Sequence, residues 1–220
     1  MKIIIIGSTG FIGSELLAVC RNKPSITSIV TITRRPLAQD ILDDPKIVSL
    51  VLKDYRHLSE HGECLRDASA AIWALRASST EVELDWPLGF AEAVIKLRES
   101  ATTPFRYMHV SGIMAEKDQQ KPLWFLQEGR RIKGLAEIKL RELANDNKGT
   151  SPWETYIARP SMVLPNPPGI VNSWAGWMLG SIRVDKLSKA MVDIVEKGAG
   201  THTFENEDLV RRAADVSAKN

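Results

Sequence analysis

Three glycines stand three residues apart near the N-terminus, in the segment GSTGFIG. The segment follows four consecutive isoleucines, Ile3 to Ile6, and precedes a stretch with helical patterning. Between a strand and a helix, such glycines let the backbone turn tightly and approach a pyrophosphate, while the helix N-terminus offers free amides to the phosphates. The segment therefore predicts a dinucleotide site formed by Gly7, Ser8, Thr9, Gly10, Phe11, Ile12 and Gly13. The alternative is a purely structural turn.

Two arginines, Arg34 and Arg35, end the second predicted strand. Folds that bind NAD usually carry an acidic residue about 20 residues beyond the glycine turn, because a carboxylate accepts a hydrogen bond from the ribose 2′-hydroxyl. A pair of cations suits a 2′-phosphate instead, so the sequence favours NADP over NAD; a solvated arginine pair is the alternative. Asp54, after the third predicted strand, is expected either to accept from the adenine amino group or to cap a helix.

The elements that must position these residues alternate between short β-rich runs and helical stretches. Because strands such as Ile3 to Ile6 are apolar on successive positions, helices should cover both faces of the sheet. The sequence predicts an α/β fold with a Rossmann-type, doubly wound parallel sheet in a single domain over residues 1–220. Strands are expected in KIIIIG, ITSIVTITRR, IVSLVLKDY, AAIWALR, FRYMHVSG and ETYIARPSMV.

The C-terminal half is expected to continue this topology. A long helix is predicted near Leu126 to Asn145, and an amphipathic helix from near Val184 to its end at Gly198. Between them, a segment near 164–182 rich in proline and glycine predicts a loop or lid rather than a domain linker.

Composition limits the classes of partner and compartment. A net charge of +2 gives no case for nucleic acid, no run of residues is long and apolar enough for a membrane span, and Ile3 to Ile6 is too short for a signal peptide. The two cysteines, Cys20 and Cys64, have no metal-site spacing, so no metal is expected and a reducing, cytoplasmic location is favoured. The expected partner is a small-molecule substrate, and a homodimer is compatible with the sequence.

Several motifs together resemble a known family: GSTGFIG, TRRP, HVSG, KGLAE and YIARPSMVL. Over nearly the whole chain, they resemble the atypical short-chain dehydrogenases, most closely the Tat-interacting-protein-like branch of the NAD(P)-binding-domain family. The resemblance implies that Ala74, Leu75 and Arg76 line the adenosine side of the cofactor. It also implies that a loop meets the nicotinamide through its backbone, at Pro160, Ser161, Met162 and Val163.

The resemblance also implies a catalytic set. Dehydrogenases of this kind use a serine after the fifth strand and a tyrosine four residues before a lysine, which holds a ribose and lowers the tyrosine pKa. Ser111 and Lys133 occupy the serine and lysine positions, but Gly129 stands where the tyrosine is expected. A glycine supplies no proton to a developing alkoxide, so ordinary carbonyl reduction is in doubt.

Other side chains are weaker candidates. His109 is expected on the same face of its strand as Ser111, either as an acid or base or, more commonly, as a hydrogen-bonded interior histidine. The charged run Glu116 to Asp118 is expected to be solvated or to replace the missing proton donor. Large apolar residues are expected either to line a substrate pocket or to form a satellite core or dimer contact: Trp124, Phe125, Trp174, Trp177 and Met178.

These observations favour an NADP-dependent oxidoreductase that reduces a small or medium apolar carbonyl or enone. Two other classes stay open. One is a sensor or regulator that holds NADP without turnover, and the other is a non-redox isomerase or cyclase in the same pocket.

Overall fold

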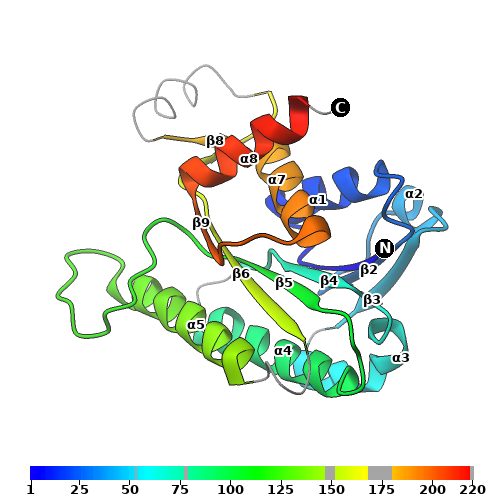
Figure 1. Cartoon of the computed structure of the whole chain (residues 1–220), viewed down its shortest axis with the longest axis horizontal. Coiled ribbons are helices and arrows are strands. Elements are labelled where there is room, and N and C mark those ends of the chain that lie inside the picture. The colour runs from blue at the N-terminus through cyan, green and yellow to red at the C-terminus, as the bar shows by residue number, and fades with distance from the viewer. Residues whose placement is uncertain (53, 77–78, 147–151, 168–179, 219–220) are drawn as a thin grey trace.

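The chain forms a seven-stranded, all-parallel sheet flanked by helices in the computed structural model, which describes residues 1–52, 54–76, 79–146, 152–167 and 180–218 (Figure 1). The strand order is β3-β2-β1-β4-β5-β6-β9. The order reverses direction between β1 and β4, as in doubly wound dinucleotide folds. The strands are β1 (Lys2–Ile6), β2 (Ser28–Thr33), β3 (Ile47–Val51), β4 (Ala70–Trp73), β5 (Phe105–Val110), β6 (Trp153–Arg159) and β9 (Thr203–Glu205). The predicted Rossmann-type fold is confirmed.

Helices cover both faces of the sheet, and each layer has its own apolar core. On one face lie α1 (Phe11–Arg21), α7 (Val184–Lys197) and α8 (Asn206–Ala218), above the sheet in Figure 1. On the other lie η1 (Tyr55–His61), α3 (Gly62–Leu65), α4 (Trp86–Leu97) and α5 (Gln127–Asp146). The short helix α2 (Gln39–Leu42) contacts β3 at the sheet edge.

Strand β1 lies inside the sheet, between β2 and β4. Its four isoleucines are fully buried, with Ile3 and Ile5 in the core under α1 and α7, and Ile4 and Ile6 in the core under α4. This two-sided burial explains why the strand is apolar at successive positions rather than alternating. It also fixes the glycine turn at the carboxyl end of β1.

The last part of the chain matches the prediction in one place and corrects it in another. Helix α7 begins at Val184 and ends before Gly198, whose φ of +75° is a conformation that favours glycine. The run ETYIARPSMV is not one strand: β6 ends at Arg159, and β7 (Val163–Leu164) pairs instead with β8 (Ile182–Arg183) in a separate two-stranded sheet. The pairing brings together the two ends of the predicted lid segment 164–182, whose residues 168–179 lie outside the described part of the chain.

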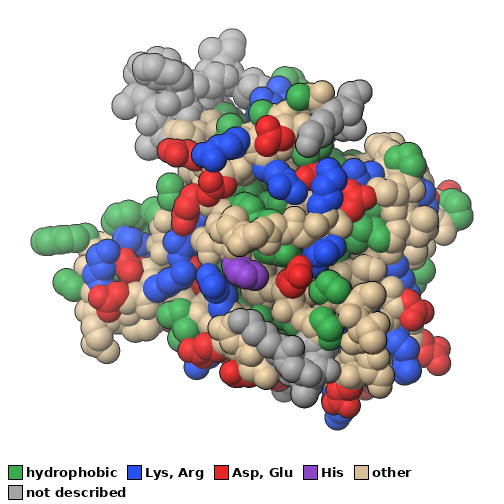
Figure 2. Space-filling view, in the orientation of Figure 1, with side chains coloured by type: hydrophobic (Ala, Val, Ile, Leu, Met, Phe, Trp, Pro, Cys, Tyr) green, Lys and Arg blue, Asp and Glu red, His purple; other side chains and the backbone are tan. Residues whose placement is uncertain are grey.

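The molecular surface mixes charges of both signs. On the face shown in Figure 2, basic and acidic side chains are interspersed over the helices and the sheet edge. Within the described ranges, no helix is long and apolar enough to cross a membrane.

Candidate functional site

The glycine turn packs its backbone tightly against neighbouring strands and its own helix. Gly7 has a φ of +87°, and a Cβ on this residue would lie 2.8 Å from the amide nitrogen of Leu75. A Cβ on Gly13 would lie 2.0 Å from the carbonyl oxygen of Gly7. Gly10 is the N-cap of α1, and there a Cβ would meet only the Gly7 oxygen, at 3.2 Å, within 4 Å. The first and third glycines are therefore required by packing, whereas the space beside Gly10 leaves room for a ligand.

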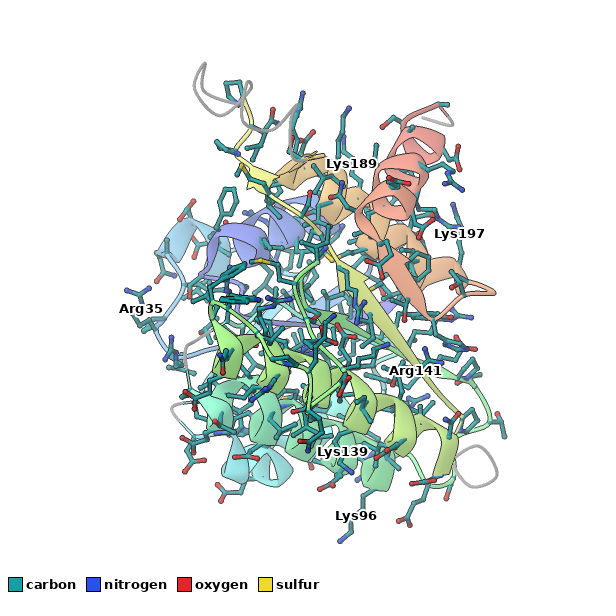
Figure 3. All side chains as sticks on the ribbon, turned by 90° about the vertical axis from the view of Figure 1, so that its left-hand side faces the viewer. Arg35, Lys96, Lys139, Arg141, Lys189 and Lys197 are labelled. Atoms are coloured by element: carbon teal, nitrogen blue, oxygen red, sulfur yellow. The ribbon has the colours of Figure 1, made fainter. Side chains whose placement is uncertain are left out.

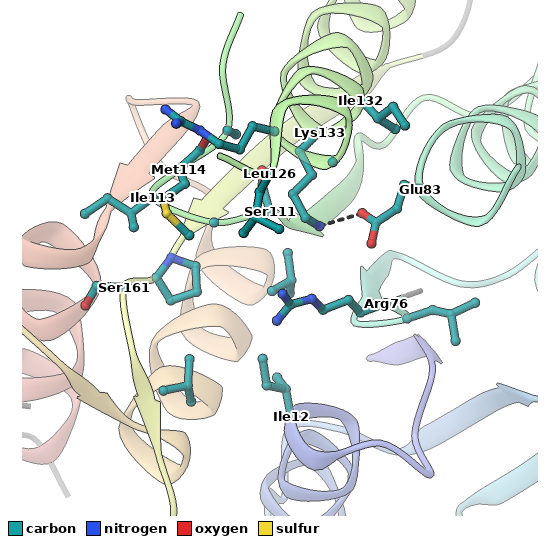
Figure 4. A pocket seen from close by; sticks show the side chains of 18 of the residues that line it. Ile12, Arg76, Glu83, Ser111, Ile113, Met114, Leu126, Ile132, Lys133 and Ser161 are labelled. Carbon is teal, nitrogen blue, oxygen red and sulfur yellow. Dashed lines mark hydrogen bonds and ion pairs between the residues drawn. The ribbon is translucent and has the colours of Figure 1, made fainter. Parts of the chain in front are cut away.

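A pocket of about 1040 Å³ opens at the carboxyl ends of the central strands, next to this turn (Figure 4). Residues from the ends of β4, β5 and β6, the start of α1 and the first turns of α5 form its walls. It therefore lies where the strand order reverses, which is the usual place for ligands in open α/β sheets. The lining residues are Ile12, Ala74, Leu75, Arg76, Ser79, Glu83, Val110, Ser111, Gly112, Ile113, Met114, Ala115, Leu126, Gln127, Glu128, Gly129, Arg130, Ile132, Lys133, Pro160, Ser161, Met162 and Val163.

The structure brings together in this lining both predicted catalytic residues, Ser111 and Lys133, of which Lys133 is also expected to hold a cofactor ribose. Eight further predicted cofactor residues lie in the lining: Ile12, Ala74, Leu75, Arg76, Pro160, Ser161, Met162 and Val163. The remaining predicted cofactor residues lie outside the lining, namely Gly7, Ser8, Thr9, Gly10, Phe11, Gly13, Arg34, Arg35 and Asp54. The hydroxyl oxygen of Ser8 is buried in the turn and has no hydrogen-bond partner among the described residues, as expected of a donor that a phosphate oxygen would accept from. The residues of the turn therefore fit a dinucleotide.

Arg34 and Arg35 are exposed at the carboxyl end of β2. Figure 3 shows the Arg35 side chain projecting outward from the body of the protein. The Arg35 carbonyl accepts a hydrogen bond from the Thr33 hydroxyl at 2.7 Å, which ties the backbone here to the strand end. Both guanidinium groups are therefore accessible at the position where a 2′-phosphate is expected. Asp54 is half-buried just after β3.

Lys133 reaches into the pocket from α5 and pairs with a carboxylate that the sequence did not point to. Its Nζ lies 2.6 Å from Oε2 of Glu83, and the two side chains are 17% and 8% exposed (Figure 4). Glu83 lies in η2 (Glu81–Asp85), a π-helical turn that leads directly into α4. Such turns are frequently found at functional sites. The only sequence signal for Glu83 is an acidic residue at the start of a helix after β4.

Ser111 is bound to a second buried carboxylate. Its hydroxyl donates to Oε1 of Glu137 at 2.6 Å, and Glu137 is fully buried on α5, one turn after Lys133. The guanidinium of Arg159 also donates to both oxygens of Glu137. Lys117 approaches the same carboxylate, with its Nζ 3.7 Å from Oε2. This network holds the end of β5 against α5 and β6.

The missing tyrosine is not supplied by another part of the chain. The three tyrosines, Tyr55, Tyr107 and Tyr156, are all buried, and none lines the pocket. Gly129 does line the pocket, and a Cβ there would meet nothing within 4 Å. The described pocket therefore has open space, not a phenol, where the resemblance places the catalytic tyrosine.

His109 is an interior side chain behind the pocket wall. Its Nδ1 lies 3.3 Å from the Tyr107 hydroxyl, and its Nε2 is buried without a hydrogen-bond partner. Burial, and to a smaller extent the charge of Lys133, lowers the pKa of His109 to about 3. The imidazole is therefore neutral at physiological pH.

Two other groups of predicted residues lie away from the pocket lining. Trp124 is 98% exposed and Phe125 is 55% exposed at the projecting loop between β5 and α5, seen at the left of Figure 1. Their predicted place in a pocket wall is wrong, because only the next residue, Leu126, turns into the lining. Glu116 pairs with Lys121 in the same loop. Trp174, Trp177 and Met178 lie outside the described residues.

Arg76 has a more prominent place than its sequence position suggested. Figure 4 shows its side chain extending across the pocket from the end of β4 towards the side where Ile12 lies. Its guanidinium makes no hydrogen bond or ion pair with any described residue. It is thus a cation available to a bound anion.

Known proteins resemble this chain only distantly in sequence. No family model matches the sequence. The protein named "Protein FMP52, mitochondrial" from Candida albicans is 25% identical over 191 residues, covering 73% of this chain and 82% of that protein.

Solved structures with the same architecture are more distant in sequence. Vestitone reductase from alfalfa matches with a TM-score of 0.70 and 15% identity, covering 93% of this chain and 76% of that one. A dTDP-glucose 4,6-dehydratase from Bacillus anthracis, in complex with NAD, matches with a TM-score of 0.71 and 14% identity, covering 100% of this chain and 82% of that one. A short-chain dehydrogenase from Burkholderia cenocepacia, in complex with NADP, matches with a TM-score of 0.68 and 14% identity, covering 100% of this chain and 93% of that one.

These likenesses show the fold alone, a Rossmann-type domain. The neighbours include complexes with NAD and with NADP, so the likeness does not distinguish between the two cofactors.

Proposed function

We propose that this protein binds NADP(H) and reduces a small or medium apolar carbonyl or enone. The observation that carries the proposal is the pocket at the reversal of strand order, which joins the start of α1 to Ser111 and Lys133. A reduced nicotinamide supplies a hydride when bound.

The cofactor would be held by three groups of residues. The glycine turn and the N-terminus of α1 would bind the pyrophosphate, because the first amides of a helix have no intrahelical partner and carry the positive end of the helix dipole. Arg34 and Arg35 would bind the 2′-phosphate, which favours NADP over NAD. Pro160 to Val163 would line the nicotinamide end.

The substrate class follows from the pocket walls. Large apolar side chains predominate around Ser111 and Lys133, so a hydrophobic body with one polar, reacting oxygen fits best. The pairing of β7 with β8 places Ile182 beside the lining residue Val163. Membership of the Tat-interacting-protein-like branch remains part of the proposal and rests on the motifs named above.

The test is NADPH consumption, followed at 340 nm, against a panel of apolar aldehydes, ketones and enones. The expected result is turnover by the wild-type protein that is lost in Lys133→Met, with Lys96→Met on the exposed far end of α4 as a matched control. Tight NADPH binding with no turnover across the panel would instead support a sensor that holds the cofactor.

A further inference from the structure

We propose that Lys133 donates the proton to the substrate oxygen in place of the missing tyrosine, and that Glu83 is the positioning residue that holds its ammonium in the pocket. This inference rests on the proposed reductase function. It assigns a role to an ion pair that the resemblance to short-chain dehydrogenases does not include.

The geometry of the pair leaves protons free for the substrate. An ammonium has three N–H donors, and Lys133 directs one of them to Glu83 over 2.6 Å. No other hydrogen bond to its Nζ occurs among the described residues. Figure 4 shows the side chain crossing open space between Ser111 and Glu83. A substrate oxygen can therefore accept from one of the two remaining N–H groups.

Other polar groups in the described lining are poor proton donors. The Ser111 hydroxyl already donates to Glu137, so its oxygen faces a ligand as an acceptor, and the Ser161 hydroxyl donates to the Gly180 carbonyl. Arg76 and Arg130 carry guanidinium groups, which do not lose a proton in proteins. Gly129 has no side chain.

The acidic and hydroxyl groups that remain are unsuitable for a different reason. The Glu128 side chain is exposed, so it is solvated rather than held against a bound substrate. The Ser79 hydroxyl is a far weaker acid than an ammonium. Among the described lining residues, Lys133 is therefore the side chain that can donate a proton to the substrate oxygen.

The pair lies among other charged groups of the lining. Arg76 from the end of β4 and Arg130 from α5 also line the pocket, and neutral His109 lies behind its wall. The Glu83 carboxylate, 2.6 Å from Nζ, pairs with Lys133 and fixes the direction in which its side chain points.

The proposed step balances as follows. A reduced nicotinamide held beside Pro160 to Val163 would supply the hydride that forms a C–H bond at the carbonyl carbon, so the π electrons of the C=O bond would move to oxygen. That oxygen forms an O–H bond with a proton from Nζ of Lys133, whose N–H bond breaks. The lysine is left as a neutral amine beside the Glu83 carboxylate, and water at the open mouth of the pocket returns the proton.

The experiment compares Lys133→Arg and Lys133→Met with the wild-type protein, using NADPH and the best carbonyl of the panel. Arginine keeps the positive charge and can pair with Glu83, but it is not a proton donor at these pH values. Because general acids contribute about 100-fold or more to rate, we expect kcat to fall by at least about 100-fold in both variants. NADPH affinity, measured by calorimetry, should stay within about threefold in Lys133→Arg.

Variants of Glu83 test the positioning role. Glu83→Gln should lower kcat by about tenfold or more with little change in KM, and Glu83→Asp should recover part of the loss. A readout independent of turnover is the rate at which the Lys133 amine is acetylated, followed by mass spectrometry on the unliganded protein. Labelling should be faster in Glu83→Gln, because the loss of the carboxylate releases the Lys133 amine from its ion pair. Glu142→Gln, which breaks the exposed Lys139–Glu142 pair on α5, is the matched control.

The outcomes separate this inference from the function on which it rests. A wild-type protein that neither binds NADPH nor consumes it would refute the proposed function, and this role with it. Wild-type turnover that survives in Lys133→Arg would refute the proton-donor role alone. Unchanged labelling and kcat in Glu83→Gln would refute the role of Glu83.

Discussion

Backbone atoms make the close contacts in the part of the site next to β1 and β4, whereas charged side chains make them in the part next to β5 and α5. We call the first the glycine half, formed by Gly7 to Gly13 with Ala74 and Leu75. The second is the charged half, formed by Glu83, Ser111, Lys133, Glu137 and Arg159. The glycine half is set mainly by one short segment, while the charged half joins residues 22 to 50 positions apart.

The difference indicates what each half can tolerate. Close backbone packing excludes any side chain at two positions of the glycine half, Gly7 and Gly13. This packing does not require a charged group to be buried. The charged half places a fully buried carboxylate, Glu137, next to partners that must all be present. We therefore expect the two halves to fail in different ways when mutated.

The largest effect is expected from the charged half. Glu137→Ala should lower the free energy of unfolding by about 3 to 5 kcal/mol, because Arg159 and Ser111 lose a buried partner. Urea denaturation measures the change. Glu142→Ala removes an exposed carboxylate from the same helix and should cost under about 1 kcal/mol. Equal losses in the two variants would contradict the network.

A smaller loss is expected in the glycine half. Gly13→Ala places a Cβ 2.0 Å from the Gly7 carbonyl oxygen, so the turn must shift, at a cost of about 1 to 3 kcal/mol. NADPH affinity should fall with stability, because the same shift moves the N-terminus of α1. Gly129→Ala, where a Cβ meets nothing within 4 Å, should be neutral or slightly stabilising. A Gly13→Ala protein as stable as the wild type would show that the close approach is not needed.

The protonation of His109 is expected to make the free energy of unfolding depend on pH by about 2 kcal/mol. Its pKa is about 3 in the folded protein and about 6.5 in an unfolded chain, so between these values the unfolded state binds more protons. Stability is therefore lost as the pH falls through this window, by about 2 kcal/mol between pH 7 and pH 5. Urea denaturation of His109→Leu at both pH values should show a flatter dependence. An unchanged dependence would mean that other groups cause the acid sensitivity.

The smallest effect is expected at the exposed arginines of β2. Changing Arg34 and Arg35 together to alanine should weaken NADPH binding by about tenfold or more, or about 1.4 kcal/mol, and NADH binding by much less. Lys96→Ala, far along α4, controls for a general loss of positive charge. Equal losses for both nucleotides would mean that the pair does not bind the 2′-phosphate.

Sequence reasoning succeeded where the physics is local. Four isoleucines before a glycine triplet predict a buried strand and its turn, and both are present. The start of α7 at Val184 and its end before Gly198 were predicted for the same reason, since helix periodicity and a terminal glycine are readable within one segment. The presence of Ser111 and Lys133 in one pocket, by contrast, was expected only from the family resemblance.

It fell short where partners come from distant elements. Nothing in the local sequence of Glu83 or Glu137 indicates that their carboxylates are buried against Lys133 and Ser111. Trp124 suggested a pocket wall by its size, yet the loop carries it outward to 98% exposure. The strand break after Arg159 was missed because the apolar pattern continues into β7, where the pairing partner is β8.

The most direct test of the account is calorimetric titration of the purified protein with NADPH and then NADH, after checking for cofactor retained from expression. We expect tight binding of NADPH and weaker binding of NADH, with the preference abolished when Arg34 and Arg35 are both changed to alanine. Absence of binding by either nucleotide would contradict the central claim that this pocket is a dinucleotide site.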